Sequence, residues 1–445
     1  MNALGRRRFL AALAAGAALP AWAPSFSALA QPTNPDVVVI GAGAAGIAAC
    51  RKLAAEGLSF VLLEAKGRIG GRAFTDPTGF DVPFDHGCSW LHQSDRNPLT
   101  PFAQEAGFTL LPHDGEEEAV FVGDRPATEA ELRRYGESWS ELRNLLVRLG
   151  SGRKDVAPES YVPMDNPWMA LSKAWIGPLS LGADFDAFSA LDWYRLESTR
   201  PNLMVREGIG TLVSLIGRNL QVSLSTPVER IAWGGRGVEV KTSKGTIAAR
   251  AAIVTVSTGV LQAERIVFDP PLPIEKLQAI DGLPMGLLAK IPLQFDGERY
   301  DIAPNTWLSY RPESDRLGYF LAWPFDSNLM IGFVGGRFGW ALSQETELTA
   351  IDFALGELQK MFGSAVRGHV VKGGFTRWAT DPDVLGSYAH QKPGWAGARQ
   401  ALGQPLAGRL FFAGEATAGG YAMTCGGAFR SGERAAVEAL KALEA

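Results

Sequence analysis

Cysteine is scarce in this 445-residue chain, and the three cysteines, Cys50, Cys88 and Cys425, stand far apart. Thiols so few and so widely spaced indicate neither a disulfide framework nor a cysteine-rich metal site. An excess of basic charge is also missing. The formal net charge is −4, and it becomes −7 when the first 30 residues, with three Arg and no acid, are set aside. A dedicated nucleic-acid-binding protein needs a basic surface, so the charge balance argues against that class.

The rest of the composition is that of a folded protein. After residue 31 the sequence lacks internal repeats and low-complexity stretches, and the whole chain is 46% hydrophobic and 20% charged. These proportions exclude wholesale disorder and collagen-like repeats. A chain of this length exceeds one ordinary hydrophobic core, so we expect two domains or one large composite.

The first 30 residues have the pattern of an export signal. Arg6-Arg7-Arg8-Phe9-Leu10 precedes an Ala-rich apolar run to about Ala23, and Ala28-Leu29-Ala30 has the small residues of a cleavage site. The apolar run is too short to be a convincing membrane span. The paired arginines resemble a twin-arginine signal, with an ordinary secretion signal or an uncleaved anchor as the alternatives. We therefore expect a periplasmic or secreted protein with no stable membrane association after cleavage.

A dinucleotide-binding turn follows. A β-branched run over 36–40 predicts a buried parallel strand, and Gly41-x-Gly43-x-x-Gly46 leads directly into a segment with helical spacing. A second apolar run over 60–63 ends in Glu64. Glycines allow a tight turn and a close approach to a pyrophosphate, the helix N-terminus favours its charge, and the acid binds a ribose. Glycine also serves tight strand–helix packing, but the complete order favours a nucleotide.

Periodicity predicts the other elements as well. We expect helices over 129–149, 346–362 and 425–443. We expect short strands over 222–256, antiparallel strands over 287–295, 305–311, 317–324 and 328–334, and a strand over 410–413.

The residues behind the ribose-binding acid indicate the cofactor. Glu64-Ala65-Lys66-Gly67-Arg68-Ile69-Gly70-Gly71-Arg72 resembles the FAD-binding signature of flavin amine oxidases. Further stretches of the same family follow in order: Gly87-Cys88-Ser89-Trp90-Leu91-His92 with Asn97-Pro98, Gly259-Val260-Leu261-Gln262, Phe268-x-Pro270-Pro271-Leu272-Pro273, Arg377-Trp378 with Asp381-Pro382 and Gly386-Ser387-Tyr388, and Phe412-Ala413-Gly414-Glu415-Ala416-Thr417. The resemblance covers nearly the whole chain after the signal.

The resemblance implies an α/β fold with two domains. A Rossmann-like FAD-binding domain of the glutathione-reductase and amine-oxidase type would be assembled from the separate segments 31–105, 203–285 and 400–445. An α+β substrate domain with a mixed or antiparallel sheet would come from 106–202 and 286–399. The polyamine oxidases and the lysine-specific histone demethylases are the most similar branch. The long helical insertion of the demethylases has no obvious place here, and an exported chain would not meet chromatin.

The same resemblance implies the residues that hold FAD. They are Gly41, Gly43, Ala45, Gly46, Glu64, Gly70, Gly71, Arg72, Ser89, Trp90, Val228, Glu415 and Thr424. No cysteine lies in the 386–388 region where monoamine oxidases attach flavin covalently, so the FAD should be non-covalent. No metal site is expected.

Five residues are expected at the reacting end of the flavin. Lys290, a charge in an apolar strand, matches the family lysine that holds a water against flavin N5; alone it would pass for a strand-edge lysine reaching water. Trp378 and Tyr388 match aromatic walls beside the amine. Thr424 stands where monoamine oxidases place a second Tyr. His92 would fix a distal substrate nitrogen, or simply be a satisfied histidine. Apart from these, acidic residues at Asp114 and 116–118 would draw cations toward an entrance or be solvated surface.

The expected reaction is oxidation of an amine at its α-carbon. Hydride passes to flavin N5, the imine hydrolyses to an aldehyde or ketone, and O2 reoxidises the flavin with release of H2O2. One alternative is a monoamine or cyclic-amine dehydrogenase that passes electrons to a periplasmic cytochrome. Another is an L-amino-acid oxidase, although no arginine is clearly placed for a substrate carboxylate. A non-catalytic FAD-binding protein is the alternative from another class. The sequence does not identify the amine or the oligomeric state.

Overall fold

The computed structural model describes residues 34–444 except 116, 164 and 315. The export signal expected at 1–30 and the acid Glu116 lie outside the described residues. A parallel sheet forms one half of the described chain. Its strands are short apolar runs, as expected where both faces of a sheet are covered. In spatial order they are β10 (Val222–Ser223), β2 (Phe60–Leu63), β1 (Val37–Ile40), β14 (Ala251–Val254) and β23 (Leu410–Phe412).

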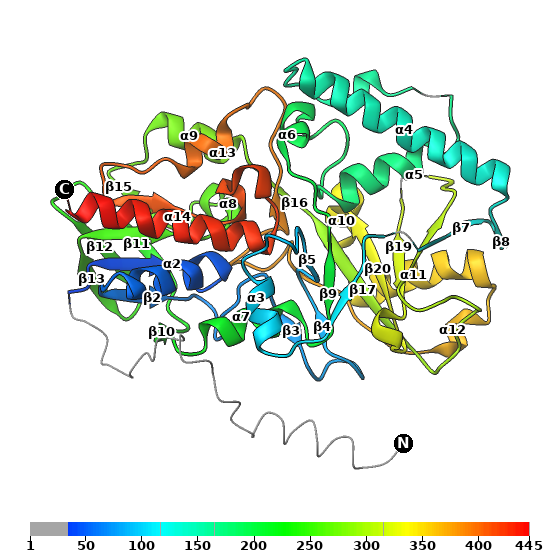
Figure 1. The fold of residues 1–445 in the computed structure, drawn as a ribbon, viewed down its shortest axis with the longest axis horizontal. Helices are drawn as coiled ribbons and strands as arrows, with labels where there is room; N and C mark the ends of the chain where they lie inside the picture. The colour runs from blue at the N-terminus through cyan, green and yellow to red at the C-terminus, as the bar shows by residue number, and fades with distance from the viewer. Residues whose placement is uncertain (1–33, 116, 164, 315, 445) are drawn as a thin grey trace, which may run out of the picture. The chain divides into compact units, whose positions relative to one another are not determined.

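Two helices cover one face of this sheet. Helices α2 (Ala44–Ala55) and α14 (Cys425–Glu444) lie side by side (Figure 1). Their approach is close, because a Cβ on Gly432 would lie 2.0 Å from the carbonyl oxygen of Ala45. The other face packs against a second sheet through a shared apolar core. That sheet contains β13 (Gly245–Ala249), β12 (Val238–Thr242), β11 (Val228–Ala232) and β15 (Val267–Asp269).

A seven-stranded sheet forms the other half, and its neighbours are antiparallel except for the parallel pair β18–β7. One face packs on α4 (Glu129–Ser151), α5 (Met169–Ala174) and α11 (Glu347–Phe362). The opposite face carries a separate apolar cluster that reaches Phe84 and Trp90. The strands in spatial order are β21 (Val370–Gly373), β17 (Leu288–Phe295), β20 (Leu329–Gly335), β19 (Tyr319–Ala322), β18 (Thr306–Tyr310), β7 (Glu118–Val122) and β8 (Arg125–Pro126).

The longer predicted elements are present within about two residues of their expected ends. Helix α4 begins at Glu129 because Thr128 and Glu131 form a reciprocal capping box. Short elements were not predicted. Five of them, β7, β8, α5, β15 and β21, are described above. The others include β3 (Thr75–Asp76), β4 (Phe84–Asp85), β5 (Trp90–Leu91), α3 (Thr100–Glu105), β6 (Leu110–Pro112), α6 (Ala190–Arg195), β9 (Leu203–Val205), α7 (Ile209–Gly217), α8 (Thr258–Gln262), α9 (Ile274–Asp281), β16 (Met285–Gly286), α10 (Gly336–Leu342), α12 (Val366–His369), β22 (Tyr388–Ala389) and α13 (Ala398–Gly403).

Some of these short elements join distant parts of the chain. Strand β5 pairs with β9, and β16 pairs with β22, so the segments around 90 and 388 are fixed against strands far away in sequence. A buried ion pair between Arg399 and Asp192, with an Nη2–Oδ2 distance of 2.8 Å, ties α13 to α6. Within the described part of the chain, no helix combines the length and apolar character needed to cross a membrane.

Candidate active site

The glycine turn between β1 and α2 has the geometry of a phosphate site. Gly41 adopts φ +102°, and its N–H donates to the Leu63 carbonyl at 2.7 Å. A Cβ on Gly46 would lie 1.8 Å from the Gly41 oxygen, so only glycine fits there. Gly43 caps α2 without a side-chain hydrogen bond, and the first turn holds no acid. The N–H groups of that turn, including that of Ala45, are therefore suited to an anion.

Glu64 lies at the carboxyl end of β2 and faces this turn. Its Oε2 accepts from the N–H of Ala42 at 2.7 Å, and its Oε1 accepts from the N–H of Lys66 at 2.8 Å. Burial raises the pKa of Glu64 against the opposing effect of these two bonds. Each carboxylate oxygen retains a further lone pair, so a ribose hydroxyl can still bind. Val228 begins β11 just beyond Thr226, whose N–H donates to the Glu64 carbonyl at 2.8 Å.

The second glycine pair lies against the first turn. Gly70 donates its N–H to the Ala42 carbonyl at 2.8 Å, and a Cβ on Gly71 would lie 3.3 Å from the Cα of Gly43. Arg72 follows, and its Nη1 lies 2.9 Å from Oε1 of Glu415. The 41–46 turn and the 70–72 segment, both expected to bind FAD, are therefore adjacent.

Arg72 and Glu415 line a pocket at the carboxyl ends of β14 and β23. Glu415 is buried, and its Oε1 accepts from the N–H of Ala389 at 3.1 Å. Open α/β sheets bind their ligands at the carboxyl ends of the strands. The α2 terminus, Glu64 and this pocket together fit a dinucleotide such as the FAD expected from the sequence.

Lys290 is buried in β17, with 3% of its surface exposed. Its Nζ donates to the Asp85 carbonyl at 2.7 Å, the Gly87 carbonyl at 2.6 Å and Ser89 Oγ at 2.6 Å. Burial lowers the pKa of Lys290 to about 8, while Asp85 and Cys88 oppose that shift. The side chain is therefore mostly an ammonium at neutral pH. Three protein oxygens accept hydrogen bonds from its three N–H groups. A water held at Nζ has to replace one of them, and Ser89 has the only mobile acceptor of the three.

Trp378 and Tyr388 are fixed on either side of the turn that contains Gly386. The indole Nε1 of Trp378 donates to the His86 carbonyl at 2.8 Å, next to the residues that hold Lys290. The Tyr388 hydroxyl donates to the Leu179 carbonyl at 3.0 Å, and burial raises its pKa. Both rings are thus held rigidly beside the segments expected to meet the flavin.

Thr424 stands at the start of α14. Its Oγ1 accepts from the N–H of Gly427 at 2.9 Å and donates to the Tyr421 carbonyl at 2.8 Å. The threonine therefore caps the helix. A small capping side chain therefore stands at the position where the resemblance places the second tyrosine of monoamine oxidases.

His92 belongs to a hydrogen-bonded chain that its own motif does not reveal. Asn202 donates from Nδ2 to Asp114 Oδ1 at 2.9 Å, so its Oδ1 is the atom that lies 2.7 Å from His92 Nδ1. Nδ1 must then carry the proton. Burial lowers the pKa of His92, although the bond to Asn202 opposes the shift. The neutral ring therefore keeps an unprotonated Nε2, a hydrogen-bond acceptor.

Aromatic rings surround this region. Trp90 and Trp307 stack at 5.9 Å, and Trp175 meets Trp307 edge-on at 5.0 Å between ring centroids. Phe333 lies 5.3 Å from Trp307, and the Lys290 ammonium is 5.9 Å from the Phe333 ring centroid. These rings form an apolar wall that links His92 and Lys290 through Trp90 and Phe333.

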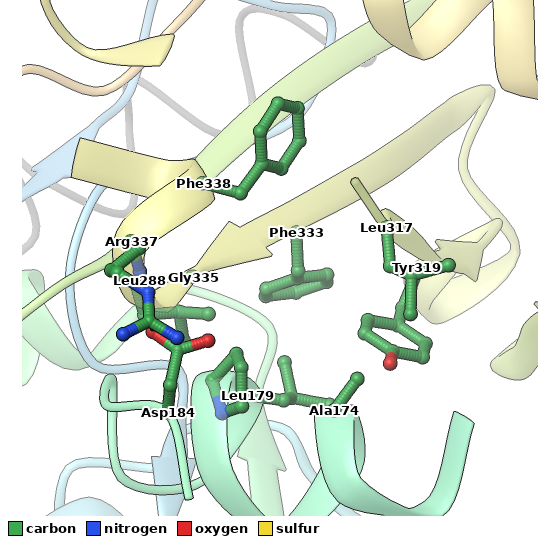
Figure 2. Close-up of a pocket in the computed structure, with 11 residues that line it drawn as sticks. Ala174, Leu179, Asp184, Leu288, Leu317, Tyr319, Phe333, Gly335, Arg337 and Phe338 are labelled. Atoms are coloured by element: carbon green, nitrogen blue, oxygen red, sulfur yellow. Dashed lines mark hydrogen bonds and ion pairs between the residues drawn. The ribbon is translucent and has the colours of Figure 1, made fainter. Parts of the chain in front are cut away.

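A pocket is lined in part by Phe333 (Figure 2). Tyr319 lies toward one end of the group drawn, and Asp184 and Arg337 lie together at the other. The Arg337 N–H donates to Asp184 Oδ2 at 2.8 Å, and its Nη1 lies 2.7 Å from Asp186 Oδ2. Leu179, whose carbonyl holds Tyr388, also lines the pocket. Most of the lining residues are thus apolar in type, and the two charged ones, Asp184 and Arg337, are paired.

Sequence reasoning missed several of these residues. Phe333 is paired with Lys290 across β17 and β20, so aligning the two predicted strands would have revealed it. Asn202 is 110 residues from His92, and no local motif marks it. Asp114, expected either as an entrance acid or as solvated surface, accepts hydrogen bonds from Asn202. Glu118 does not lie in a loop, because it begins β7 and accepts from the Tyr135 hydroxyl at 3.2 Å.

Among the described residues, no group of three His, Cys, Asp or Glu is arranged to hold a metal ion.

Comparisons with known proteins agree with this geometry. Residues 117–440 match the family described as flavin containing amine oxidoreductase, and residues 39–106 match an NAD(P)-binding Rossmann-like domain. Polyamine oxidase 5 of Oryza sativa subsp. japonica is 31% identical over 89% of this chain and 86% of its own length. Human lysine-specific histone demethylase 2 is 26% identical, over 91% of this chain but 53% of its own length.

Solved structures show the same fold. A putrescine oxidase with bound putrescine has a TM-score of 0.76 at 20% identity, covering 92% of this chain and 99% of its own. Cyclohexylamine oxidase from Brevibacterium oxydans also has a TM-score of 0.76, at 21% identity, covering 93% of this chain and 100% of its own. The length of the family match and the identity to a plant polyamine oxidase decide the family. The chain belongs to the flavin-containing amine oxidoreductases and is an FAD-dependent amine oxidoreductase.

Proposed function

We propose that this chain oxidises a diamine or polyamine at a carbon next to nitrogen, giving an imine that hydrolyses to an aldehyde or ketone, with O2 as the final electron acceptor and H2O2 as a product. Bound FAD supplies the acceptor for the hydride. One observation carries the choice of substrate: the Asp114–Asn202–His92 chain leaves an acceptor nitrogen on a half-buried histidine. A second, protonated substrate nitrogen can donate to that atom. The similarity to plant polyamine oxidases supports the same class.

The aromatic wall prepares the reacting nitrogen. An alkylamine with a pKa near 10 is mostly protonated at neutral pH, and releasing the proton costs about 4 kcal/mol. A dry apolar site disfavours the ammonium and lowers that cost. Trp378, Tyr388 and Phe333 supply such surroundings beside Lys290. His92 would then bind the distal nitrogen in its charged form, and the two ends of one substrate would be treated differently.

The ammonium of Lys290 would organise the reacting edge. It is held between the 85–89 segment and β17 by the three bonds described above. Rotation of the Ser89 side chain about Cα–Cβ moves Oγ away and frees one N–H of Nζ for a water without breaking the two backbone contacts. In this role Lys290 positions a water and carries positive charge next to the place where negative charge develops.

Replacing Asn202 by Ala tests the substrate class. Loss of the Nδ1 partner lets the His92 proton move to Nε2, which removes the acceptor. We expect KM for putrescine and spermine to rise about 10- to 100-fold, the worth of a hydrogen bond to a charged group, and KM for phenethylamine to change little. His369→Ala, which removes an exposed histidine paired with Asp296, is the control and should change neither. Equal losses for phenethylamine and spermine would contradict the proposal.

A second candidate rests on the pocket in Figure 2. Most of its lining residues are apolar in type, and its Asp184 is already bound to Arg337, so a monoamine or cyclic amine would also fit. Such an enzyme would pass electrons to a cytochrome. Parallel assays of peroxide release and cytochrome reduction distinguish the two acceptors. A carboxylate clamp, as an L-amino-acid oxidase needs, is disfavoured because Arg337 already pairs with two aspartates.

We also propose that the protein acts after export, with FAD bound before it crosses the membrane. The twin-arginine pattern of the first 30 residues supports this location, because that route moves folded proteins.

A further inference from the structure

Asp85 is a buried acid whose backbone and side chain bind different parts of the structure. It ends β4, and its backbone carbonyl accepts from the Lys290 ammonium at 2.7 Å. Its carboxylate binds two other elements. Oδ1 accepts from the hydroxyl of Thr75 in β3 at 2.5 Å, and Oδ2 accepts from the N–H of Ile209, the first residue of α7, at 3.0 Å. One residue therefore connects Lys290 with β3 and α7.

The start of α7 lies close against these side chains. Gly208 adopts φ +89°, and a Cβ there would lie 2.3 Å from Thr75 Oγ1 and 2.9 Å from Asp85 Oδ1. A Cβ on Gly210 would lie 2.2 Å from the backbone nitrogen of Thr75. Gly208 has no side chain to cap the helix, so the Asp85 carboxylate takes the place of an N-cap residue. Thr75 Oγ1 also accepts from the N–H of Thr211 at 3.1 Å.

The partners of the Asp85 carboxylate favour its ionised form. The N–H groups of Ile209 and Gly210 can only donate, and the Thr75 hydroxyl gives its proton to the same carboxylate. Burial raises the pKa of Asp85, whereas Lys290 and these hydrogen bonds lower it. Because each of the bonds described comes from a donor, the side chain is held as an anion near the Lys290 ammonium.

The backbone that follows Asp85 holds two of the residues expected at the flavin. The carbonyls of Asp85 and Gly87 accept from the Lys290 ammonium at 2.7 and 2.6 Å. Between them, the His86 carbonyl accepts from the Trp378 indole at 2.8 Å. Three successive carbonyls thus fix the ammonium and one aromatic wall. A shift of this short stretch would move both.

We propose that Asp85 is a positioning residue for Lys290: by binding Thr75 and the start of α7 through its carboxylate, it fixes the backbone that holds the ammonium. The inference rests on the proposed function, which gives Lys290 its role. The negative charge adds a second effect, because a nearby anion favours the protonated lysine. Burial lowers the pKa of Lys290 to about 8, and the Asp85 charge opposes that shift. Without this charge, Lys290 loses its proton at a lower pH.

Other groups that face Lys290 are not altered by the test. Cys88, in the same segment, also opposes the lowering of the Lys290 pKa. Burial and the Lys290 charge lower the pKa of His86 to about 4, so this ring is neutral above pH 7. The ring centroids of Phe84 and Phe333 lie 5.7 and 5.9 Å from Nζ and carry no charge. A change seen on replacing Asp85 is therefore due to Asp85.

Asp85→Asn tests the charge, since asparagine has nearly the same shape. Its oxygen can accept from the Ile209 N–H, and its NH2 group can donate to Thr75 Oγ1. The unfolding free energy is measured against pH with and without Lys290→Met, and the difference isolates the Lys290 proton. Stability rises with pH once the folded lysine has lost a proton that the unfolded chain still binds. We expect this rise to begin near pH 8 in the wild type and about one unit lower in Asp85→Asn.

Rates of flavin reduction and reoxidation test the positioning. Asp85→Asn and Thr75→Val should retain FAD and slow the half-reaction that Lys290→Met slows. We expect a loss of about 10- to 100-fold at pH 7.5, the usual consequence of a small displacement of a reacting group. Thr75→Ser keeps the hydroxyl and should restore a rate near that of the wild type.

Asp36→Asn is the matched control. Asp36 accepts from the N–H and hydroxyl of Ser59 at 3.0 and 2.7 Å and pairs with Arg250. It precedes β1, at the end of that strand away from the glycine turn. The control should lower stability and leave the half-reactions and the pH of the Lys290-dependent rise unchanged. The proposal is overturned if Asp85→Asn behaves like Asp36→Asn in both measurements.

The Thr75 variants decide the matter if Asp85→Asn does not fold. Thr75→Val as fast as Thr75→Ser would then overturn the proposal, and a slow Thr75→Val with a fast Thr75→Ser would support it. The pH measurement on Asp85→Asn needs no amine. An earlier rise in a protein whose flavin no amine reduces would support the link between Asp85 and Lys290 and reject the proposed function. An active amine oxidase in which neither the rise nor the rates change would do the reverse.

Discussion

Replacing Lys290 by Met is expected to slow flavin reduction or flavin reoxidation by about 10²- to 10⁴-fold, the usual contribution of one positioned proton-handling group, while FAD stays bound. The reason is geometric. Lys290 contacts the 85–89 segment and none of the residues that hold the pyrophosphate and ribose. Methionine fills a similar volume but has no N–H and no charge. Stopped-flow measurement of both half-reactions, beside the flavin content of the purified variant, checks the result.

Lys276 supplies the control. It is also buried, and its Nζ donates to the carbonyls of Ala401, Leu402 and Gln404 at 2.8, 2.8 and 2.6 Å. Burial lowers its pKa to about 8, as for Lys290. Lys276→Met should therefore cost comparable stability and leave both half-reactions near the wild-type rates. Wild-type rates in Lys290→Met would refute its assigned role.

Comparison of the wild-type protein with Lys290→Met also reports the charge state of Lys290. Its pKa is 10.5 when exposed and about 8 when folded, so between these values the unfolded chain binds the extra proton and stability rises with pH. This rise is worth about 3 kcal/mol and should be absent in Lys290→Met. Unfolding free energies of both proteins at pH 7.5 and pH 10 measure it.

Replacing Gly46 by Ala is expected to weaken FAD binding by at least roughly 100-fold, equivalent to about 3 kcal/mol. The added Cβ would lie 1.8 Å from the Gly41 oxygen, and relief of that clash moves the turn that approaches the pyrophosphate. Gly41 already adopts φ +102°, a conformation that favours glycine, so the turn has little freedom to adjust. Flavin content and an FAD titration of the apoprotein measure the loss.

Gly136→Ala is the matched control for that substitution. Gly136 lies inside α4 with open space around its Cα, so alanine there should raise stability by about 0.5–1 kcal/mol and leave FAD binding intact. If Gly46→Ala binds FAD as tightly as Gly136→Ala does, with an unchanged circular dichroism spectrum, the glycine turn is not the pyrophosphate site.

The sequence was most informative where function depends on neighbouring residues. The glycine turn, Glu64 and the helix after it are contiguous, so their spacing alone predicted the nucleotide site. The antiparallel strands were predicted because the residues along each run alternate with the period of a strand. In these places local pattern and final structure follow from the same few residues.

Partners that are distant in the chain could not be predicted. Lys290 is held by oxygens about 200 residues earlier in the sequence, and the tautomer of His92 depends on Asn202 and Asp114. Such pairs are decided by how the sheets pack, and no motif in either segment specifies the other.

The most direct measurement is anaerobic titration of the purified yellow protein with amines from phenethylamine to spermine, followed by absorbance near 450 nm. We expect loss of that band with one equivalent of a diamine or polyamine, and much slower loss with phenethylamine. A correctly folded protein that shows no such band even after incubation with FAD, or whose band no amine bleaches, would contradict the central claim that this chain uses FAD to oxidise an amine.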